Sequence, residues 1–396
     1  MRSAEPAAPA LMRMQGKEIA PQQAQTYHED SQACEKRISQ QCAAGKLAQK
    51  VQPLIRRLPE GALDIIGDVH GEIEALENLL RHLGYDADGR HAAGRHVVFV
   101  GDLCDRGPDS PQVLRRVRRM IEQGNAYAVL GNHEMNLLAD DAKDGSGWYF
   151  PEQLARDVPR YQDYVQMADQ DKADLADFLN TLPVVLERED IRIVHAAWLP
   201  EAVAAVRALG NIGAREAYRA YETQAQQQMP HEAWYAAYQA QLPAYRDEGR
   251  DETRQPPHLD GICGYDLFFS RANPLRSLTC GSEHRAERPF YAAGRWRLTT
   301  RSRWWLDYDD AVPVVMGHYW RQWRTRRDER ALLFPETGDC WLGKRKNVFC
   351  VDFSVGAKWK TRLPDAPPHG VFRLAALRFP EKTLMFDDGE TAATRA

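Results

Sequence analysis

Short apolar runs alternate with amphipathic segments in the first organised stretch of the chain, and each apolar run is followed at once by a glycine. The runs at 62–66, 96–100 and 126–130 are typical of buried strands. Between them, residues 71–84 and 110–124 place apolar side chains at helical spacing, and the second of these segments begins with a Ser cap followed by a proline. The order strand, helix, strand, helix, strand predicts a parallel sheet with crossover helices.

The regions outside this stretch differ in character. Residues 39–57 are weakly helical in pattern, and we expect residues 1–60 to form an N-terminal extension that is partly disordered and partly helical. A single folded domain is predicted over 61–390. Polar, mostly helical stretches at about 140–188 and 199–300 are predicted to be insertions that form a cap.

Further strands are predicted in the second half of the chain. Residues 191–198, 312–320 and 347–355 each contain a short apolar run of the kind found in buried strands. Residues 371–379 and 383–386 predict an antiparallel hairpin that closes the fold.

The composition narrows the class of protein. Hydrophobic residues make up 43% and charged residues 27%, which is typical of a globular protein. Lys and Arg total 52 against 56 Asp and Glu, so we expect no general DNA binding. No apolar run approaches the roughly 18 residues of a membrane span. The seven cysteines form no CxxC pair, which argues against a disulfide frame and favours a cytoplasmic location.

Polar clusters follow each of the first three predicted strands. Asp68 and His70 follow the first, Asp102 the second and Asn132 the third, at intervals of about one strand–helix–strand unit. The carboxyl ends of neighbouring parallel strands lie at one edge of a sheet, so these side chains should converge there. Oxygen and imidazole donors of this kind suit hard or borderline divalent metals.

Other residues extend this candidate site. His195 and His318 each follow a later apolar strand and complete six candidate ligands, enough for two metals about 3.5–4 Å apart that share a carboxylate. Arg106 can clamp phosphoryl oxygens in its planar fork. His133 could protonate a leaving oxygen, with Asp105 orienting its ring.

The segments GDVHG, GDLCDRG and GNHE, with the two later histidines, resemble the calcineurin-like metallophosphoesterase superfamily, and within it a bacterial member of the phosphoprotein phosphatase (PPP) type, related to symmetrical diadenosine tetraphosphatases. The resemblance implies a four-layer α/β/β/α sandwich. It implies hydrolysis of phosphate esters by in-line attack of metal-bound hydroxide. The site residues that it implies are Asp68 and His70 on metal one, Asp102 as the bridge, Asn132, His195 and His318 on metal two, Arg106 on phosphate, and His133 with Asp105 as the acid dyad.

The motifs do not determine which metal ions bind or which arginine of the cap contacts phosphate. Mn²⁺ is the first expectation for the two metals, with Fe or Zn as alternatives, because the mixed donor set does not select one ion. Arg301 or Arg303 is expected to supply a second phosphate contact from the cap. Tyr319 and Trp320, next to His318, are candidates either for lining the pocket or for packing.

Three hypotheses about function stay open. The first is a phosphatase acting on phosphoprotein or a general phosphate ester. The second is a nucleotide hydrolase of the diadenosine tetraphosphatase or RNA-end phosphatase type. The third is a non-catalytic, metal-binding interaction protein. Asp105 and Glu134 favour the first over a diadenosine tetraphosphatase, whereas the segment after His195, Ala196-Ala197-Trp198, departs from the eukaryotic protein phosphatases.

Overall fold

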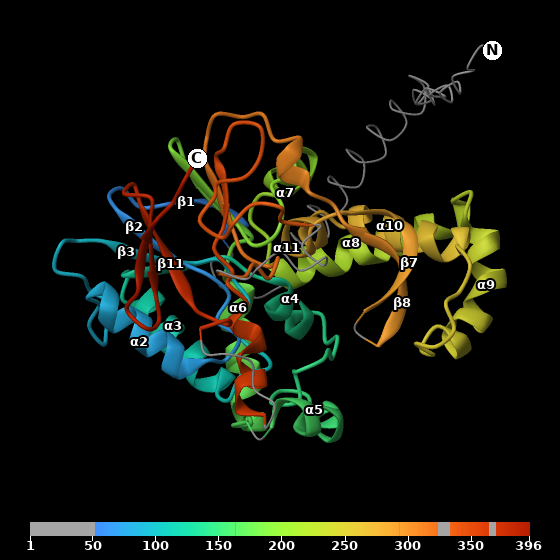
Figure 1. The fold of residues 1–396 in the computed structure, drawn as a ribbon, viewed down its shortest axis with the longest axis horizontal. Coiled ribbons are helices and arrows are strands. Elements are labelled where there is room, and N and C mark those ends of the chain that lie inside the picture. Colours follow the sequence, from blue (N-terminus) through green and yellow to red (C-terminus); the bar gives the residue numbers. More distant parts are fainter. Residues whose placement is uncertain (1–51, 163, 293, 324–332, 364–369) are drawn as a thin grey trace, which may run out of the picture. The chain divides into compact units, whose positions relative to one another are not determined.

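The computed structural model describes residues 52–162, 164–292, 294–323, 333–363 and 370–396 (Figure 1). Most of the predicted N-terminal extension, residues 1–51, lies outside this part. Within it, two β-sheets and a set of helices form a mixed α/β fold, which confirms the predicted fold class.

The first sheet has six strands in the order β13-β12-β11-β2-β3-β4. Its strands are β2 (Leu63–Ile66), β3 (His96–Phe99), β4 (Ala126–Ala128), β11 (Ala375–Phe379), β12 (Thr383–Phe386) and β13 (Thr391–Ala393). β2, β3 and β4 pair in parallel, as the alternating pattern predicts. β11 and β12 form the predicted antiparallel hairpin, and β11 joins it to β2.

Two amphipathic helices connect the parallel strands, α2 (Ile73–Leu83) and α3 (Ser110–Glu122). α2 ends at Gly84, whose φ of 92° is a left-handed cap that glycine adopts without strain. The predicted cap of α3 is one residue off. Asp109, and not Ser110, is the N-cap, because its carboxylate accepts from the backbone N–H of Gln112.

The second sheet has five strands in the order β1-β5-β6-β9-β10. They are β1 (Ile55–Arg57), β5 (Val185–Arg188), β6 (Ile191–Val194), β9 (Val314–Met316) and β10 (Val348–Cys350). The helical prediction for residues 39–57 is therefore wrong at 55–57, which form β1 and pair in parallel with β5. Leu54 and Leu58, on either side of β1, are buried, so this strand is part of the folded domain and precedes the predicted boundary at residue 61.

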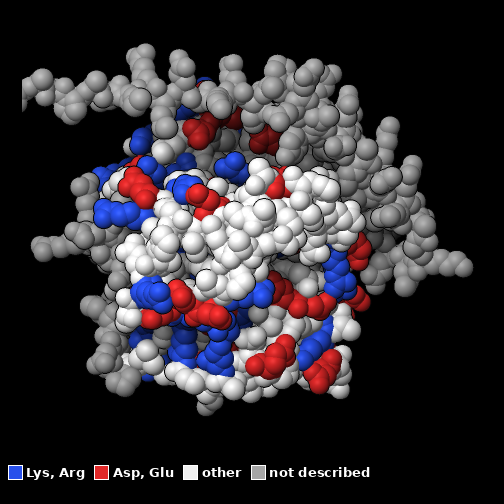
Figure 2. Space-filling view, turned by 90° about the vertical axis from the view of Figure 1, so that its right-hand side faces the viewer, with Lys and Arg blue, Asp and Glu red and all other residues white. Residues whose placement is uncertain are grey.

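The remaining helices form a region beside the sheets. They are α4 (Asn132–Leu138), α5 (Leu154–Tyr161), α6 (Asp169–Asn180), α7 (Pro200–Ala208), α8 (Ala214–Gln228), α9 (Tyr235–Glu248), α10 (Asp260–Ala272) and α11 (Pro274–Cys280), with short 3-10 turns η1 (Pro151–Gln153), η2 (Met229–His231), η3 (Trp304–Leu306) and η4 (Val355–Arg362). In Figure 1 this region extends from α4 and α11 beside the sheets to α9. The face that carries α9 has a broad uncharged area bordered by charged side chains (Figure 2).

None of the helices in the described ranges is long and apolar enough to cross a membrane.

The second predicted insertion is not wholly helical. Its end forms an antiparallel hairpin of β7 (Glu283–Ala292) and β8 (Arg295–Arg301), with a register shift between Arg285 and Phe290. Leu298 of β8 packs with Ile262 and Cys263 of α10 in a small core of its own. The hairpin is stabilised by this contact and by strand pairing. β8 alternates Trp296 and Leu298 with arginines, but β7 contains several charges and Pro289, so the sequence carries only half of a hairpin signal.

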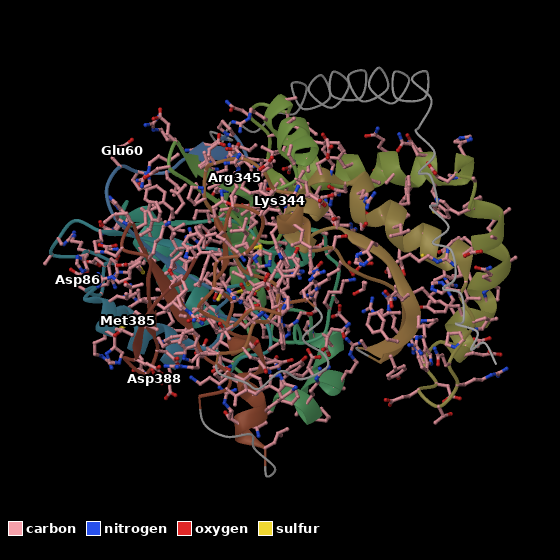
Figure 3. The ribbon with its side chains drawn as sticks, turned by 45° about the horizontal axis from the view of Figure 1, so that its top comes forward. Glu60, Asp86, Lys344, Arg345, Met385 and Asp388 are labelled. Atoms are coloured by element: carbon pink, nitrogen blue, oxygen red, sulfur yellow. The ribbon has the colours of Figure 1, made fainter. Side chains whose placement is uncertain are left out.

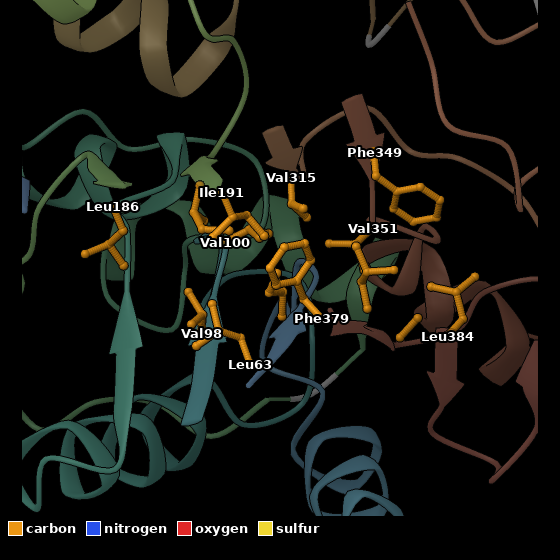
Figure 4. Packing of buried hydrophobic residues seen from close by; sticks show 14 of the residues in the cluster. Leu63, Val98, Val100, Leu186, Ile191, Val315, Phe349, Val351, Phe379 and Leu384 are labelled. Carbon is orange, nitrogen blue, oxygen red and sulfur yellow. The ribbon is translucent and has the colours of Figure 1, made fainter. Parts of the chain in front are cut away.

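The main core lies between the two sheets (Figure 4). Leu63 and Val98 of the first sheet and Ile193, Val315 and Phe349 of the second all belong to one cluster of buried side chains. Because both inner faces are apolar, the sheets are fixed against each other, and the loops that follow their strands are held in a set position. Figure 3 shows Asp86, which follows α2, on the same side of the molecule as Met385 of β12 and Asp388.

Candidate metal centre

Six side chains that follow strands of both sheets converge on one place. Asp68 and His70 follow β2, Asp102 follows β3 and Asn132 opens α4 after β4. His195 follows β6 and His318 follows β9 in the second sheet. Potential ligand atoms of Asp102, His195 and His318 lie within 4.8 Å of one another, and so do those of His70, Asp102 and His133. The structure thus brings together all six residues predicted as metal ligands.

Asp102 lies at the centre of this cluster. Its Oδ2 is 3.3 Å from Nε2 of His195, 3.7 Å from Nε2 of His70 and 3.9 Å from Nε2 of His133. One carboxylate therefore faces histidines on both sides. This is the arrangement that a ligand shared between two cations requires.

The other donors divide between the two sides of Asp102. Asp68 Oδ2 lies 3.9 Å from Nε2 of His70. On the other side, Oδ1 of Asn132 is 2.9 Å from Nδ1 of His318 and 3.3 Å from Nε2 of His195. The cluster can therefore offer two neighbouring sets of ligand atoms.

Backbone carbonyls orient two of the histidines. Nδ1 of His70 lies 3.0 Å from the carbonyl of Cys104, and Nδ1 of His195 lies 2.8 Å from the carbonyl of Val100. A ring N–H that donates to a carbonyl fixes the tautomer and leaves Nε2 with its lone pair facing the cluster. Both rings are therefore oriented as ligands before any cation binds.

The backbone at the cluster is strained and closely packed. His70, Asp102 and His318 have φ values of 48°, 48° and 69°, in the left-handed region that non-glycine residues seldom adopt. A Cβ on Gly131 would lie 2.2 Å from Oδ1 of Asp102, and one on Gly317 would lie 2.0 Å from Oδ1 of Asp68. Only glycine at these two positions allows the chain to pass the carboxylates so closely.

The electrostatics of the cluster fit a divalent cation. Burial and the neighbouring Asp352 carboxylate raise the pKa of Asp68. Burial and the Arg106 guanidinium lower the pKa of His70, so its imidazole is neutral. Burial opposes a charge on His195, yet the carboxylate of Asp102 raises its pKa to about 10. His70 and His318 are neutral donors, and the proton that Asp102 favours on His195 is one that a bound cation would displace, so the residues present fit the predicted metals.

The predicted acid dyad and phosphate clamp lie beside the cluster. Nδ1 of His133 is 2.5 Å from Oδ2 of Asp105, and Nε1 of Trp148 donates to the other carboxylate oxygen at 2.6 Å. Nη1 of Arg106 lies 3.0 Å from Nε2 of His70. Trp148 was not predicted, because it lies in the first insertion with no motif around it, and only the fold brings it to Asp105.

The two candidate cap arginines lie in different places. Nη1 of Arg301 donates to the carbonyl of the ligand candidate His318 at 3.2 Å. Arg303 instead lines a separate cavity of about 1150 Å³, together with Trp198 of the second sheet's loop and Leu306. Of the two, only Arg301 contacts a residue of the cluster.

Two buried carboxylates support the loops of the cluster and were not predicted as site residues. Glu134 accepts hydrogen bonds from the backbone N–H groups of Asp102 and Leu103, at 2.9 and 2.7 Å. Asp352 accepts from the backbone N–H groups of Trp320 and Ser354, at 2.7 and 2.8 Å. The sequence drew attention only to Glu134, and the role of both carboxylates in holding backbone depends on contacts that spacing does not reveal.

Comparisons with known proteins agree with this geometry. The family model described as calcineurin-like phosphoesterase matches residues 62–242. This match over residues 62–242 confirms the resemblance predicted from the motifs.

Curated relatives match over shorter stretches. The chain is 49% identical over 74 residues to the asymmetrical bis(5′-nucleosyl)-tetraphosphatase PrpE of Oceanobacillus iheyensis, covering 18% of this chain and 30% of that protein. It is 37% identical over 140 residues to the symmetrical bis(5′-nucleosyl)-tetraphosphatase of Janthinobacterium sp. (strain Marseille), covering 34% and 43%. The match thus spans less than half the length of these relatives.

Among solved structures, a cold-active protein-tyrosine phosphatase of a psychrophilic Shewanella species aligns with a TM-score of 0.44 and 16% identity, over 89% of this chain and 86% of that one. A protein serine/threonine phosphatase from Saccharomyces cerevisiae aligns with a TM-score of 0.41 and 13% identity, over 92% and 88%.

Proposed function

We propose that this protein is a metal-dependent phosphoesterase that hydrolyses phosphate esters at the cluster around Asp102. The observation that carries the proposal is the convergence of six candidate ligands from two sheets, with Asp102 Oδ2 facing His195 at 3.3 Å and His70 at 3.7 Å. Two divalent cations held there, Mn²⁺ being the first expectation, would activate a water molecule and offset the charge of the phosphoryl oxygens.

The chain's own residues then have separate tasks. Asp68 and His70 would hold one cation, Asn132, His195 and His318 would hold the other, and Asp102 would be shared between them. Arg106 is next to this cluster and can bind two phosphoryl oxygens through its planar fork.

The leaving group needs a proton, and His133 is the candidate donor. Its Nδ1 is held by Asp105 and its Nε2 points toward Asp102, so the ring presents Nε2 to the cluster. Protonation of the leaving oxygen by His133 would complete hydrolysis. Neither a serine nor a cysteine nucleophile is needed for this reaction.

A nucleotide hydrolase is the second candidate. It is supported by the names of the curated relatives, both bis(5′-nucleosyl)-tetraphosphatases, although the match spans less than half of each. A phosphoprotein substrate remains the expectation drawn from Asp105 and Glu134. The two differ in the group attached to the phosphate, and a substrate panel distinguishes them.

The test is the substitution Asp102→Asn in protein loaded with Mn²⁺. We expect turnover of p-nitrophenyl phosphate to fall by at least about 10³-fold, because the shared ligand loses its charge. Asp309→Asn is the matched control, since Asp309 pairs at the surface with Arg345, which is labelled in Figure 3. Equal turnover in Asp102→Asn and in the control, with metal in excess, would show that the cluster is not the catalytic site.

A further inference from the structure

The first insertion contributes a buried aromatic side chain to the candidate acid dyad. Trp148 is 2% exposed, and its Nε1 donates to Oδ1 of Asp105 at 2.6 Å, while Oδ2 of Asp105 lies 2.5 Å from Nδ1 of His133. The indole N–H thus occupies the carboxylate oxygen that His133 does not use. The position of Trp148 therefore restricts how the carboxylate can turn, and with it how the ring of His133 is oriented.

The backbone that leads to this indole also contacts the turn that carries the dyad carboxylate. The carbonyl of Gly145 accepts the N–H of Arg106 at 3.0 Å. Asp105 and Arg106 have φ values of 75° and 70°, in the left-handed region that is costly for residues with a side chain. A Cβ on Gly145 would lie 2.7 Å from Cγ of Arg106, so the two segments are in close contact. The insertion thus holds a strained turn at a backbone N–H as well as at a carboxylate.

A second buried carboxylate holds these residues of the insertion in turn. Asp157 of α5 accepts the N–H of Gly145 through Oδ1 at 3.1 Å and the N–H of Gly147 through Oδ2 at 2.8 Å. The hydroxyl of Tyr164 also donates to Oδ2, at 3.1 Å. The backbone directly before Trp148 is therefore fixed at two points by one side chain.

The burial of Asp157 is unusual for the short helix that carries it. Of the eight residues of α5, only Asp157 and Tyr161 are buried, and Asp157 is 0% exposed. Burying a carboxylate costs free energy unless hydrogen bonds compensate for the lost water. An apolar side chain would fill the same place without that cost. What the carboxylate adds is its hold on the backbone of residues 145–147.

We propose that Asp157 is a positioning residue for the acid dyad. It fixes residues 145–147, the next residue Trp148 fixes the carboxylate of Asp105, and that carboxylate orients His133. This inference rests on the proposed phosphoesterase function and adds to it a part of the chain that lies outside the motifs. The first insertion then serves the transfer of the proton to the leaving group, and not only the shape of the cap.

The test is Asp157→Asn in Mn²⁺-loaded protein, assayed on glycerol 2-phosphate and on p-nitrophenyl phosphate. Asparagine cannot accept both backbone N–H groups, because its amide nitrogen would face one of them. We expect kcat on glycerol 2-phosphate to fall about tenfold more than kcat on p-nitrophenyl phosphate, whose leaving group needs no proton. Asp169→Asn, in α6 of the same insertion, is the matched control, because the side chain of Asp169 is 89% exposed.

A second variant tests the link through the indole. Trp148→Phe keeps an aromatic ring but removes the N–H that Asp105 accepts. It should show the same selective loss on glycerol 2-phosphate. The double variant should lose little more than either single variant, because both substitutions act on one carboxylate. Trp148→Phe also keeps the proposal falsifiable if Asp157→Asn does not fold, which circular dichroism and thermal melting would show.

The outcomes separate this inference from the proposed function. If the wild-type protein hydrolyses neither ester, the proposed function fails and the inference fails with it. If the wild-type protein is active and Asp157→Asn loses the same factor on both esters, or no more than the control, Asp157 supports only the fold and the inference is overturned, while the phosphoesterase stands. Trp148→Phe without a selective loss, or losses that multiply fully in the double variant, would overturn it as well.

Discussion

Individual side chains at the centre are held by more than one neighbour. Both carboxylate oxygens of Asp105 are occupied, one by His133 and one by Trp148. Its backbone N–H donates to Oγ of Ser110 at 2.9 Å. Such a fixed carboxylate orients the imidazole of His133, and the ring can present only Nε2 to a substrate.

The role of His133 as a proton donor predicts a dependence on the leaving group. We expect His133→Ala to lower kcat on an alkyl phosphate by about 10²-fold or more, the usual contribution of general acid catalysis. On p-nitrophenyl phosphate the loss should be much smaller, because p-nitrophenolate leaves without a proton. Steady-state kinetics on both esters measure the difference.

The control for this prediction is His284→Ala, since His284 is exposed and lines the separate cavity beside Arg303. A loss in His133→Ala that is the same on both esters would assign His133 to metal binding, which its place 3.9 Å from Asp102 also permits. The slope of log kcat against the pKa of the leaving group distinguishes the two roles.

At the level of the elements, the first turn of α4 is coupled to the loop after β3. Glu134, in this turn, accepts the N–H groups of Gly131 and Asp102 through one oxygen and that of Leu103 through the other. The carboxylate therefore binds the segments that carry Asn132 and Asp102. A negative charge in the first turn also suits the helix dipole.

We predict that Glu134→Gln destabilises the fold and weakens metal binding together. The amide nitrogen would face backbone N–H groups, so at least one buried donor loses its partner, at a cost of about 1–3 kcal/mol. Differential scanning calorimetry and a Mn²⁺ titration measure the two effects. Glu74→Gln is the matched control, because Glu74 lies in the first turn of α2 and is exposed. A melting temperature and an affinity equal to those of the control would contradict the prediction.

The sequence predicted the elements whose signals are local. Strands β2, β3 and β4 each carry an apolar run that stops at a glycine, so their order and the edge where their loops meet could be predicted. β1 has only Ile55 as an apolar residue, and β7 contains Pro289 and several charges. These strands form because a partner strand or helix is available, which no local pattern records.

The same limit applies to the candidate centre. Asp68, Asp102 and Asn132 could be placed together because each follows a strand of one sheet. Trp148 and Asp352 could not, because they reach the centre from an insertion and from a loop of the second sheet. The distinction between Arg301 and Arg303 also needed the structure, since Arg301 ends β8 whereas Arg303 lies beyond the strand, at the start of η3.

Across the whole molecule, one buried carboxylate joins distant segments of the first sheet. Asp64 of β2 is completely buried and accepts from the hydroxyl of Tyr85 at 2.7 Å. It also accepts from Nη2 of Arg95 at 2.8 Å and from Nε of Arg378 at 3.0 Å. Arg95 in turn pairs with Glu381 in the turn of the closing hairpin. One network of charged side chains thus joins β2 to the closing hairpin, which lies far from it in the sequence.

This network predicts that Asp64→Asn strongly destabilises the fold, although Asp64 is not one of the residues of the candidate metal centre. Asparagine keeps the shape but removes the charge that balances Arg378 and, together with Glu381, Arg95; breaking a buried ion pair costs up to about 3–5 kcal/mol, and the pairing of Arg95 with Glu381 places the expected cost at the lower end. Urea denaturation should show a lower midpoint for this variant. Asp339→Asn, which breaks the surface pair with Arg395, should cost no more than about 1 kcal/mol. If both variants unfolded at the same urea concentration, the buried network would not be what joins the C-terminal hairpin to β2, and apolar packing alone would have to account for it.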